Sequence, residues 1–405
     1  NRIKSFLNKS NKVYFYFDGK KLAGYLGESL ASALLANDIK LVGRSFKYHR
    51  PRGIMALGVE EPNALVTITK GNQIEPNLQA TQVQVYDGLI VESQNRWPNL
   101  KYDFGSILSF FSKLLPAGFY YKTFMWPSSM WKFYEHFIRK MSGLGKASNK
   151  EQDLDKYEHV NFYVDVLIVG GGASGLVSAF LAAKMGLKVL IADENPDLGG
   201  SMLYEKDIQV NSMPCIVWIK KLIKSLKELK NVTILRRSTV FGYHDHNYIT
   251  VAERCLDNKP NNSSTFVKQR LWMVRSKKVV LAQGLIERPL TISGNDLPGV
   301  MLSCSVRGYI NKFGVLPGNE VVICTNNDDA YRTAIELNKV GANVKLIADL
   351  RTNTSGSLLQ SVKELGIEVL FSHSITSITG FRKVTKVEVS ELSSDGRTLI
   401  SKPKI

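Results

Sequence analysis

A glycine-rich turn between two apolar runs constrains this chain more than any other feature of its sequence. Residues 164–169 form a short, β-branched run typical of a buried parallel strand, and they lead directly into Gly-Gly-Gly-Ala-Ser-Gly at positions 170–175. A stretch rich in small residues follows, and a second apolar run over residues 188–192 ends at Asp193. Strand, G-x-G-x-x-G turn, slim helix, second strand and acid, in this order, predict a βαβ dinucleotide-binding unit over residues 163–193.

The pattern predicts a separate function for each of three glycines in this turn. Gly170 allows the tight passage from strand to helix, Gly172 lets the backbone approach a pyrophosphate, and Gly175 lets the helix lie close to the strand. Ala173 and Ser174 complete the first helical turn. We expect the phosphates at this helix N-terminus, because its free N–H groups and the helix dipole favour negative charge.

The acid at the end of the second strand completes the predicted site. Asp193 follows the turn at about the spacing of 20 residues at which a carboxylate accepts hydrogen bonds from the adenosine ribose. Because a carboxylate repels a 2′-phosphate, NADP is the least expected occupant. Glu194, directly after it, is a further candidate for cofactor binding. These residues do not choose between NAD and FAD.

The positive charge of the chain favours an ordinary solvated basic surface, a share of which faces a partner, over a nucleic-acid groove. With 405 residues the chain has room for two or three domains, and its net charge is +17. The lysines are scattered, and no block of basic residues with interleaved aromatics dominates, so we expect no nucleic-acid groove. The longest apolar region, residues 104–121, is interrupted by Lys113 and Pro116, so we expect no membrane span. No signal-peptide pattern is visible near Asn1.

The four cysteines predict neither a metal site nor a disulfide framework. They are far apart, and none stands in a C-x-x-C or Cys/His pattern with metal-ligand spacing. Buried thiols in a reducing, cytoplasmic compartment are the expected state of Cys215, Cys255, Cys304 and Cys324. No Ser/His/Asp arrangement, carboxylate pair or thiolate motif is apparent, so we predict no catalytic residue in this chain.

The first hundred residues predict a small α+β domain. Residues 13–17 and 21–25 read as two strands joined by a hairpin turn at Asp18-Gly19. A helix over residues 29–37 follows, and then further short strands at 40–42, 64–69 and 81–84. A β-grasp fold is the obvious candidate for this order of elements.

Several long and unusual strings give the chain a family resemblance. It resembles the α subunits of heterotetrameric sarcosine oxidases, and less closely those of amino-acid and opine dehydrogenases and of hydrogen cyanide synthase. Those subunits continue into a folate-binding domain, so we expect this chain to be a fragment that lacks it. The strings that carry the resemblance, besides the glycine turn, are residues 43–53, 60–64, 94–98, 116–124, 287–290, 295–302 and 325–334.

The resemblance implies a ferredoxin-like first domain, and the residues argue that it holds no metal. A [2Fe–2S] cluster needs four cysteine thiolates, and no cysteine precedes Cys215. We therefore expect a β-grasp domain without a cluster. The expected parts are a β-grasp domain over residues 1–105, an aromatic-rich helical connector over 106–160, a Rossmann domain over 161–317 completed by 384–405, and a second βαβ domain over 318–383.

The resemblance also implies cofactors and partners. NAD is implied in this chain, FMN at the interface with a flavin-bearing β subunit, and FAD within that subunit. Smaller subunits complete the implied heterotetramer, which oxidises sarcosine, reduces O2 to peroxide and passes a one-carbon unit to tetrahydrofolate. By the same likeness Gly200 and Ser201 lie near the cofactor, and Gly284 ends the strand that closes the first Rossmann domain over the ribose.

The second βαβ pattern, over residues 318–349, differs from the first at its turn. Where glycines are expected it has Thr-Asn-Asn-Asp-Asp-Ala at 325–330, and two carboxylates at a helix start repel a pyrophosphate. Its Asn and Asp residues are good helix caps. We therefore predict a degenerate copy that has lost the phosphate site.

Several alternatives stay open at this point. The basic string at residues 44–52 is either a docking surface for an anionic partner or flavin phosphate, or a solvated loop. The aromatic connector is either a subunit seam or ordinary core. The whole chain could also be the α subunit of a proline or opine dehydrogenase, or a nucleotide-binding scaffold without a catalytic role.

Overall fold

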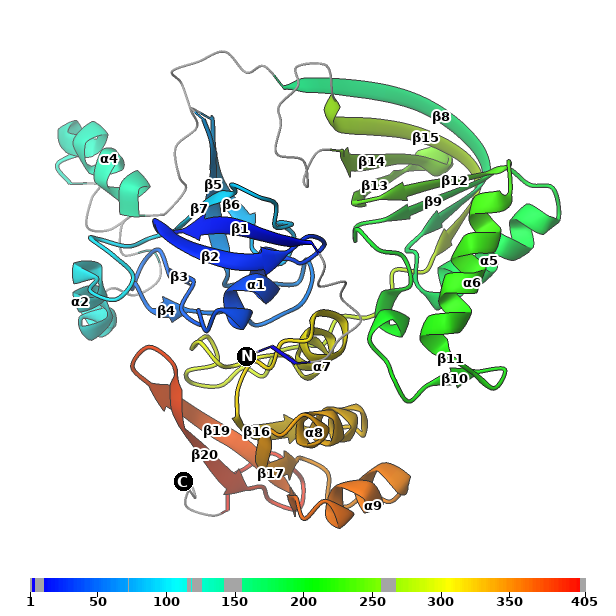
Figure 1. The fold of residues 1–405 in the computed structure, drawn as a ribbon. Coiled ribbons are helices and arrows are strands. Elements are labelled where there is room, and N and C mark those ends of the chain that lie inside the picture. Colours follow the sequence, from blue (N-terminus) through cyan, green and yellow to red (C-terminus); the bar gives the residue numbers. More distant parts are fainter. Residues whose placement is uncertain are drawn as a thin grey trace. The chain divides into compact units, whose positions relative to one another are not determined.

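The structure is a computed structural model, and it describes residues 2–3, 11–71, 73–114, 118, 126–141, 155–255 and 267–400. The chain forms two compact units (Figure 1). Unit 1 combines Asn1–Glu151 with Glu287–Ile405, and unit 2 is Gln152–Ile286. Unit 2 is therefore an insertion between two segments that fold together.

Unit 1 begins with a mixed five-stranded sheet packed against one helix. The strand order is β2-β1-β7-β5-β6, in which β1 and β7 are parallel and the other pairs are antiparallel. The helix α1 (Leu30–Ala36) starts at Ser29, whose side chain accepts a hydrogen bond from the Ser32 amide. The strands are β1 (Lys12–Phe17), β2 (Lys20–Tyr25), β5 (Leu65–Lys70), β6 (Gln73–Gln79) and β7 (Ile90–Ser93).

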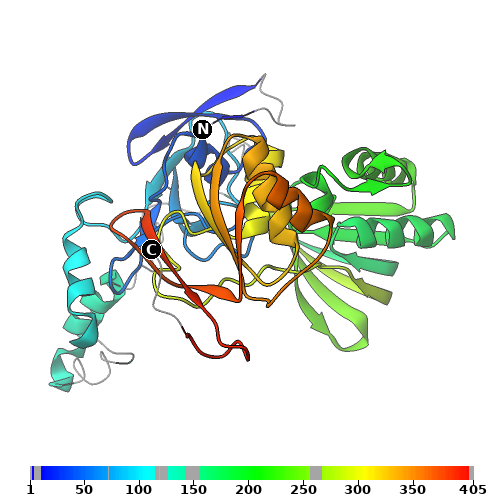
Figure 2. The same cartoon turned by 90° about the horizontal axis from the view of Figure 1, so that it is seen from below.

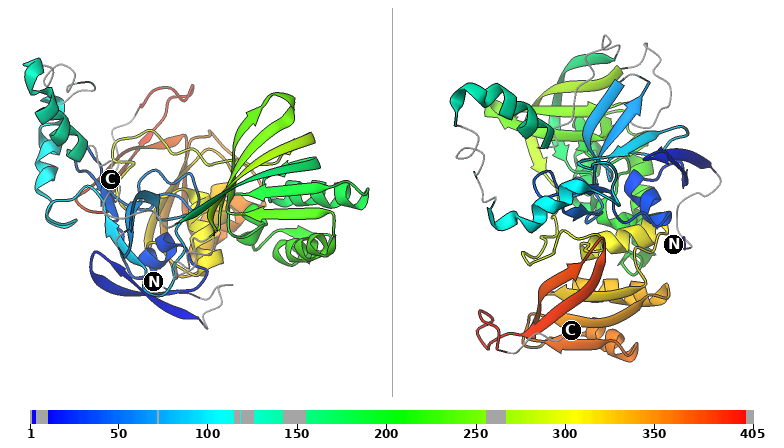
Figure 3. Two further views of the ribbon diagram at one scale, coloured as in Figure 1. Left: turned by 90° about the horizontal axis from the view of Figure 1, so that it is seen from above. Right: turned by 90° about the vertical axis from the view of Figure 1, so that its left-hand side faces the viewer.

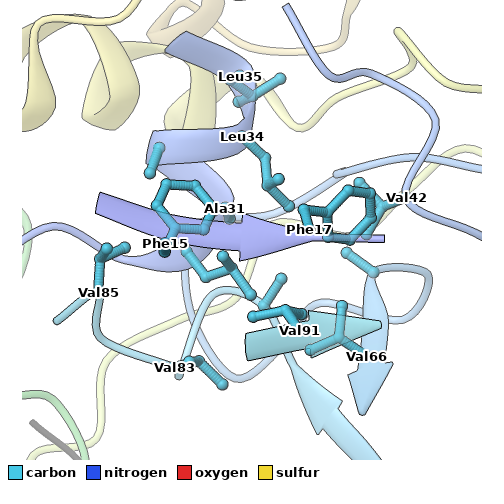
Figure 4. Close-up of a cluster of buried hydrophobic side chains, with 14 of the residues drawn as sticks. Phe15, Phe17, Ala31, Leu34, Leu35, Val42, Val66, Val83, Val85 and Val91 are labelled. Atoms are coloured by element: carbon cyan, nitrogen blue, oxygen red, sulfur yellow. The ribbon is translucent and has the colours of Figure 1, made fainter. Parts of the chain in front are cut away.

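Alternation along β1 sets the core of this sheet. Phe15 and Phe17 are buried, while Tyr14 and Tyr16 between them are exposed. Figure 4 shows both phenylalanines directed toward Leu34 of α1 and the strands beneath. Burying one such side chain contributes about 1.5–3 kcal/mol. The same core is completed from far along the chain by Tyr309, Phe313 and Val315.

The predicted connector contains short helices. They carry exposed aromatic side chains, including Phe104 and Phe110. Residues 115–117, 119–125 and 142–154 of the predicted connector lie outside the described residues. The elements of this stretch are η1 (Phe104–Ser106), α2 (Ile107–Phe110), η2 (Ser112–Leu114), η3 (Ser128–Met130) and α4 (Trp131–Met141). Earlier in the chain, within the first domain, β3 (Gly43–Arg44) and β4 (Pro51–Arg52) form a two-stranded ribbon.

Unit 2 is built on a six-stranded sheet of order β12-β9-β8-β15-β14-β13. The four strands β12, β9, β8 and β15 run parallel, and β15, β14 and β13 form an antiparallel meander. The strands are β8 (Lys156–Val169), β9 (Val189–Asp193), β12 (Val232–Arg236), β13 (Ser238–His244), β14 (Tyr248–Arg254) and β15 (Val267–Leu281). The sequence predicts a meander of four strands at residues 232–236, 239–243, 248–251 and 271–275. The last three are found in β13, β14 and β15, but the first is β12, which pairs in parallel with β9. The fourth meander strand and the strand predicted at 278–284 are one continuous element, β15.

Two helices cover one face of this sheet. α5 (Ala173–Lys184) and α6 (Cys215–Glu228) lie side by side along it (Figure 2, Figure 3). Leu176 and Ala179 of α5 pack with Ile219 of α6 against the strands. The shorter elements of unit 2 are η4 (Gly200–Leu203), β10 (Gln209–Val210), β11 (Met213–Pro214) and η5 (Asp245–Asn247).

The second segment of unit 1 contains the other βαβ pattern. It forms a parallel three-stranded sheet of order β16-β17-β18, with a β-hairpin of β19 and β20. Its elements are α7 (Ser303–Gly308), the π-helix η6 (Tyr309–Phe313), β16 (Glu320–Thr325), α8 (Asp329–Lys339), β17 (Asn343–Asp349), α9 (Ser357–Glu364), β18 (Glu368–Phe371), β19 (His373–Gly380) and β20 (Val384–Glu391).

The pairing of β20 differs from the expectation that residues 384–405 return to the first Rossmann sheet. β20 pairs with β19, its neighbour in sequence, and the two form a sheet of their own. A three-residue turn joins them, and such a short connection favours antiparallel pairing within a hairpin. The other predicted domain boundaries stay predictions. Among the described residues, no helix has the length and apolar character needed to cross a bilayer.

Candidate dinucleotide-binding site

The first glycine of the turn is required by the fold of unit 2 itself. Gly170 follows β8 with a φ of +100°, a conformation that L side chains rarely adopt. A Cβ at this position would lie 2.3 Å from the carbonyl oxygen of Ala282, on the segment that follows β15. The Gly170 amide donates to the Ala192 carbonyl at 2.8 Å. Backbone from three strands therefore meets at this residue, and no side chain fits.

Gly175 is required for a similar reason. A Cβ there would lie 2.0 Å from the carbonyl oxygen of Gly170 and 3.2 Å from the Ile168 side chain. The first turn of α5 thus rests directly on the end of β8, as the fingerprint predicts. Gly170 and Gly175 explain how the turn folds, but they carry no information about a ligand.

Gly172 has no such structural requirement. Its φ of −76° and ψ of −173° are extended backbone angles that any residue adopts. A Cβ at this position would meet no protein atom within 4 Å. Because neither strain nor packing demands a glycine here, the open space next to its backbone is available to a bound group.

The N-terminus of α5 is prepared for an anion. Gly172 is the N-cap residue and has no side chain to accept from the first-turn amides, and no acidic residue stands in that turn. Ala173 and Ser174, the predicted phosphate-binding positions, form the first turn, and Ser174 is exposed. A helix of 12 residues thus presents its amides and positive dipole end beside the space at Gly172.

Asp193 is attached to the glycine turn. Its Oδ2 accepts from the Gly171 amide at 2.6 Å and its Oδ1 accepts from the Asn195 amide at 2.8 Å. The residue is 8% exposed. A carboxylate has about four acceptor positions, so two remain for hydroxyl donors. Glu194, the other candidate acid, is half-buried, and its carbonyl accepts from Arg254 at 3.4 Å.

The Gly199-Gly200 loop reaches the same turn. The Gly199 amide donates to the Gly171 carbonyl at 2.8 Å. Gly200 has a φ of +55°, and a Cβ on it would lie 3.2 Å from the Cα of Gly172. Ser201 is the next residue and is exposed. The predicted cofactor residues Gly170, 172–175, Asp193 and Gly200 are therefore brought together.

Gly284 is placed less closely. The Ala282 amide donates to the Val169 carbonyl at 2.8 Å, which fixes the end of β15 beside the turn, and Gly284 follows two residues later. It has a φ of +76° and is exposed. Sequence reasoning did not identify Gly199 as the residue that fixes the loop. Its φ of +129° is a backbone property that the letters Gly-Gly indicate only loosely.

The second turn, before α8, is filled by its own side chains. The Thr325 hydroxyl accepts from the Asn327 amide at 3.1 Å, and the Asn327 side chain accepts from the Asp329 amide at 3.0 Å. Arg351 joins the Asp349 carboxylate, at 2.6 Å, to that of Asp328, at 2.8 Å. The amides of Asn327 and Asp329 are thus already used within the turn, and two carboxylates stand where a phosphate would lie.

Asp349 occupies the position in this second unit that Asp193 has in the first. Its carboxylate is buried and accepts from the Tyr331 hydroxyl at 2.7 Å as well as from Arg351. Burial acts to raise the pKa of Asp349, but the hydrogen bonds from Arg351 and Tyr331 outweigh it and hold the pKa below its ordinary value. The acid is therefore ionised and fully engaged with the protein.

Comparison with known families agrees with this geometry. Residues 164–400, more than half of the chain, match the family model described as pyridine nucleotide-disulphide oxidoreductase. This chain belongs to the pyridine nucleotide-disulphide oxidoreductase family. In this oxidoreductase, residues 10–96 also match a model described as a 2Fe-2S iron-sulfur cluster binding domain.

Curated relatives confirm the resemblance seen in the sequence. The chain is 44% identical over 85% of its length to the alpha chain of sarcosine oxidase from Rhizobium meliloti (strain 1021), and 34% identical over 90% to that from Corynebacterium sp. (strain U-96). It is also 29% identical over 50% of its length to one of the subunits of opine oxidase from Agrobacterium tumefaciens (strain Ach5), of which it covers 40%. It spans 35% and 33% of the lengths of the two sarcosine oxidase proteins, so it corresponds to about a third of such chains.

A solved structure shares the fold. The crystal structure of L-proline dehydrogenase from P. horikoshii superposes with a TM-score of 0.58 at 22% sequence identity, covering 96% of this chain and 58% of that chain. A likeness at this level of identity describes architecture. It supports the mixed α/β fold of this member of the oxidoreductase family.

The basic string of this oxidoreductase is tied into unit 1. Arg44 is buried and donates to the Leu100 carbonyl at 2.7 Å, and His49 lies 2.7 Å from Asp103. Both remaining arginines, Arg50 and Arg52, contact Asp296, at 2.7 and 3.0 Å. These contacts hold the string within unit 1. The docking role stays a prediction.

Proposed function

We propose that this chain is the nucleotide-binding part of the α subunit of a flavin-dependent amine oxidase complex, with NAD in the turn at residues 170–175. The observation that carries the proposal concerns Gly172. Neither its backbone angles nor the packing around it requires a glycine, and it stands at the uncapped N-terminus of α5. Backbone without side chains beside free helix amides is what a pyrophosphate needs.

In this proposal, different residues of unit 2 bind different parts of the dinucleotide. The amides of Ala173, Ser174 and Gly175 hold the pyrophosphate, and Asp193 orients the adenosine ribose through its remaining acceptor positions. Gly200 and Ser201 lie toward the other end of the molecule, and Glu194 and Gly284 border the sugar. When bound, NAD supplies a nicotinamide ring able to carry a hydride.

Three of the four cysteine thiols are poor candidates for a catalytic nucleophile, which supports a subunit without its own catalytic group. Burial raises the pKa of Cys215 and Cys324, and raises that of Cys304 to about 12. A thiol with a raised pKa stays protonated at neutral pH and is a poor nucleophile. We infer that the amine is oxidised on a partner subunit that holds FAD, with FMN at the interface. Free thiols also fit a reducing, cytoplasmic compartment.

The relatives support the choice of substrate and partners. Two relatives named as sarcosine oxidase subunits match over 85% and 90% of this chain. We infer sarcosine as the substrate of the complex, a heterotetramer with β and smaller subunits, and tetrahydrofolate as the one-carbon acceptor through a further domain. The N-terminal β-grasp domain then has no cluster, and the second βαβ unit is a degenerate insertion without a phosphate site.

The direct test is to identify the nucleotide. The purified chain is denatured, and the released small molecules are identified by mass spectrometry before and after incubation with NAD, FAD or FMN. We expect NAD to be retained with one molecule per chain. Retention of FAD in its place, or no retention of any dinucleotide at saturating concentration, would contradict the assignment.

A second candidate is an α subunit that serves a dehydrogenase acting on proline or an opine. The shared fold with L-proline dehydrogenase and the identity to the opine oxidase protein favour it. In the complex reconstituted with its partner subunits, oxygen consumption with sarcosine but not with proline or octopine supports the first proposal. The reverse pattern supports the second. If an unoccupied nucleotide site leaves turnover unchanged, the nucleotide-binding unit is a scaffold.

A further inference from the structure

A buried carboxylate organises the loop between β4 and β5. Glu61 accepts four hydrogen bonds, all from backbone amides: those of Met55 and Ala56 at 2.8 and 2.7 Å to one oxygen, and those of Asn63 and Ala64 at 2.8 and 3.0 Å to the other. The loop is thus wrapped around one anion.

The neighbouring acid extends this arrangement. Glu60 accepts from the amides of Leu57 and Gly58 at 3.2 and 3.1 Å. Six backbone N–H groups of a ten-residue loop therefore point at two adjacent carboxylates. Successive amides that converge in this way form an anion-binding nest, the kind of concavity that also holds phosphates and iron–sulfur clusters in proteins.

Burial shows that the nest is an interior feature. Glu61 is 1% exposed. Removing a carboxylate from water is costly unless hydrogen bonds compensate for it. Burial raises the pKa of Glu61, and its four amide donors act in the opposite direction. A solvated surface acid does not need such a set of donors, so the loop is specifically shaped around this side chain.

The position of the nest connects it to a missing cofactor. The loop lies inside residues 10–96, which match a 2Fe-2S cluster binding domain, yet the sequence has no cysteine before Cys215. A [2Fe–2S] cluster needs four thiolate ligands, so the residues present do not fit it. Such a cluster is anionic and accepts hydrogen bonds from backbone amides. The amides are present here, while the thiolates are absent.

We propose that Glu61 is a built-in anion that takes the place of an iron–sulfur cluster in the nest of this domain. Glu60 holds the adjoining amides in the same way. The loop keeps the inward-facing backbone of a cluster loop without metal, and the domain is converted from an electron carrier into a rigid structural part.

The contacts of the loop show what this rigidity serves. With its amides turned inward to Glu61, the loop turns carbonyls toward the α7 segment. The Ala56 carbonyl accepts from the buried Tyr309 hydroxyl at 2.8 Å, and the Met55 carbonyl accepts from the Leu302 amide at 2.9 Å. Met55, Ala56 and Leu302 form a buried cluster of their own. The carboxylate therefore fixes the face through which two distant segments of unit 1 join.

Chemical rescue of a trimmed side chain tests the proposal. Glu61→Ala removes the anion and leaves a space lined by amides, so the full chain should lose at least about 5 °C in apparent Tm. Excess formate should recover at least half of that loss, and it should again slow hydrogen exchange at the amides of residues 55, 56, 63 and 64. The matched control is Glu92→Ala, at an exposed position on β7. This variant should keep the apparent Tm of the unaltered chain, and formate should not alter it.

Two further variants decide the case even if Glu61→Ala does not fold. Glu61→Asp keeps the charge, whereas Glu61→Gln keeps the length but turns an amide donor toward backbone donors. An anion requirement predicts that Glu61→Asp is the more stable of the two. If Glu61→Gln is as stable as the unaltered chain, or if formate leaves Glu61→Ala unchanged at saturation, the proposal is wrong.

Discussion

The two βαβ units of this chain have the same order of elements and opposite chemistry at the turn. Before α5, the turn has glycines, an uncapped helix N-terminus and no acid in the first turn. Before α8, the Asn327 side chain accepts from the Asp329 amide, Asp329 stands in the first turn, and Arg351 pairs with both Asp328 and Asp349. The comparison teaches that the βαβ topology provides a place for a phosphate, and that the turn residues decide whether the place is open or filled.

The largest effect is expected when a side chain fills the open space at the turn before α5. Gly172→Val should lower the affinity of the chain for its dinucleotide at least about 1,000-fold, or about 4 kcal/mol, because the new side chain fills space that no protein atom uses. Thermal unfolding should stay nearly unchanged. Isothermal titration with NAD and a melting curve measure both.

Two other glycines serve as controls for that variant. Gly318→Val has equal room for its side chain and lies outside the nucleotide turn, so it should bind NAD normally. Gly170→Val should lose the fold of unit 2 rather than binding alone, since its Cβ meets the Ala282 carbonyl at 2.3 Å. Normal NAD affinity in Gly172→Val would remove the basis for placing the pyrophosphate at this turn.

The turn before α8 should lose stability when Arg351, the cation that pairs with its carboxylates, is replaced. Arg351→Met leaves the buried Asp349 carboxylate without its ion pair, and we expect a loss of about 3 kcal/mol in unfolding free energy at pH 7. The pKa of Asp349 is lowered in the folded chain, so its contribution to stability is present above the ordinary value near 4 and is lost as the pH falls through the lowered one.

The difference between Arg351→Met and the unaltered chain should therefore shrink below about pH 4. Urea unfolding at pH 7 and at pH 3.5 measures it. Lys345→Met, which breaks the exposed pair with Glu320, is the control and should cost less than about 0.5 kcal/mol at either pH. An equal loss for Arg351→Met at both pH values would show that the ion pair is not its cause.

The smallest expected effect concerns the acid of the open turn. Asp193→Asn should weaken NAD binding about tenfold, or about 1.4 kcal/mol, because a charged acceptor for the ribose hydroxyls is lost. The same change should narrow the preference for NAD over NADP, since the 2′-phosphate is no longer repelled. Dissociation constants for both nucleotides test this, and Glu194→Gln should have the weaker effect of the two substitutions.

Local patterns allowed the nucleotide turn to be predicted from the sequence. The glycines, the strand before them and Asp193 lie close together in the chain, so their relation depends little on tertiary context. The strand predicted at residues 232–236 has the observed bounds of β12. Strand β6, in contrast, is rich in polar residues and contains Pro76, so its sequence does not alternate clearly, and it was missed. The strand predicted at 81–84 forms only a single bridge, between Gln84 and Ser29.

Features that depend on distant partners could not be read in advance. Arg44 and Arg50 belong to what looked like a charged run, but they form ion pairs with Asp103 and Asp296, which lie far away in sequence. His49 of the same run lies within hydrogen-bond distance of Asp103. Glu61 received no role from the sequence, because its partners are backbone amides that every sequence has. Backbone donors carry no sequence signal, so a buried anion of this kind is visible only in three dimensions.

The discontinuity of unit 1 has a consequence for how the chain is made. Tyr309, Phe313 and Val315 belong to the same core as Phe15 and Val91, yet the whole of Gln152–Ile286 lies between them in the chain. A ribosome that has released the first hundred residues has therefore not yet synthesised the side chains that complete their core. Unit 2 therefore emerges whole before the core of the five-stranded sheet can be completed, although the strands of that sheet are translated first.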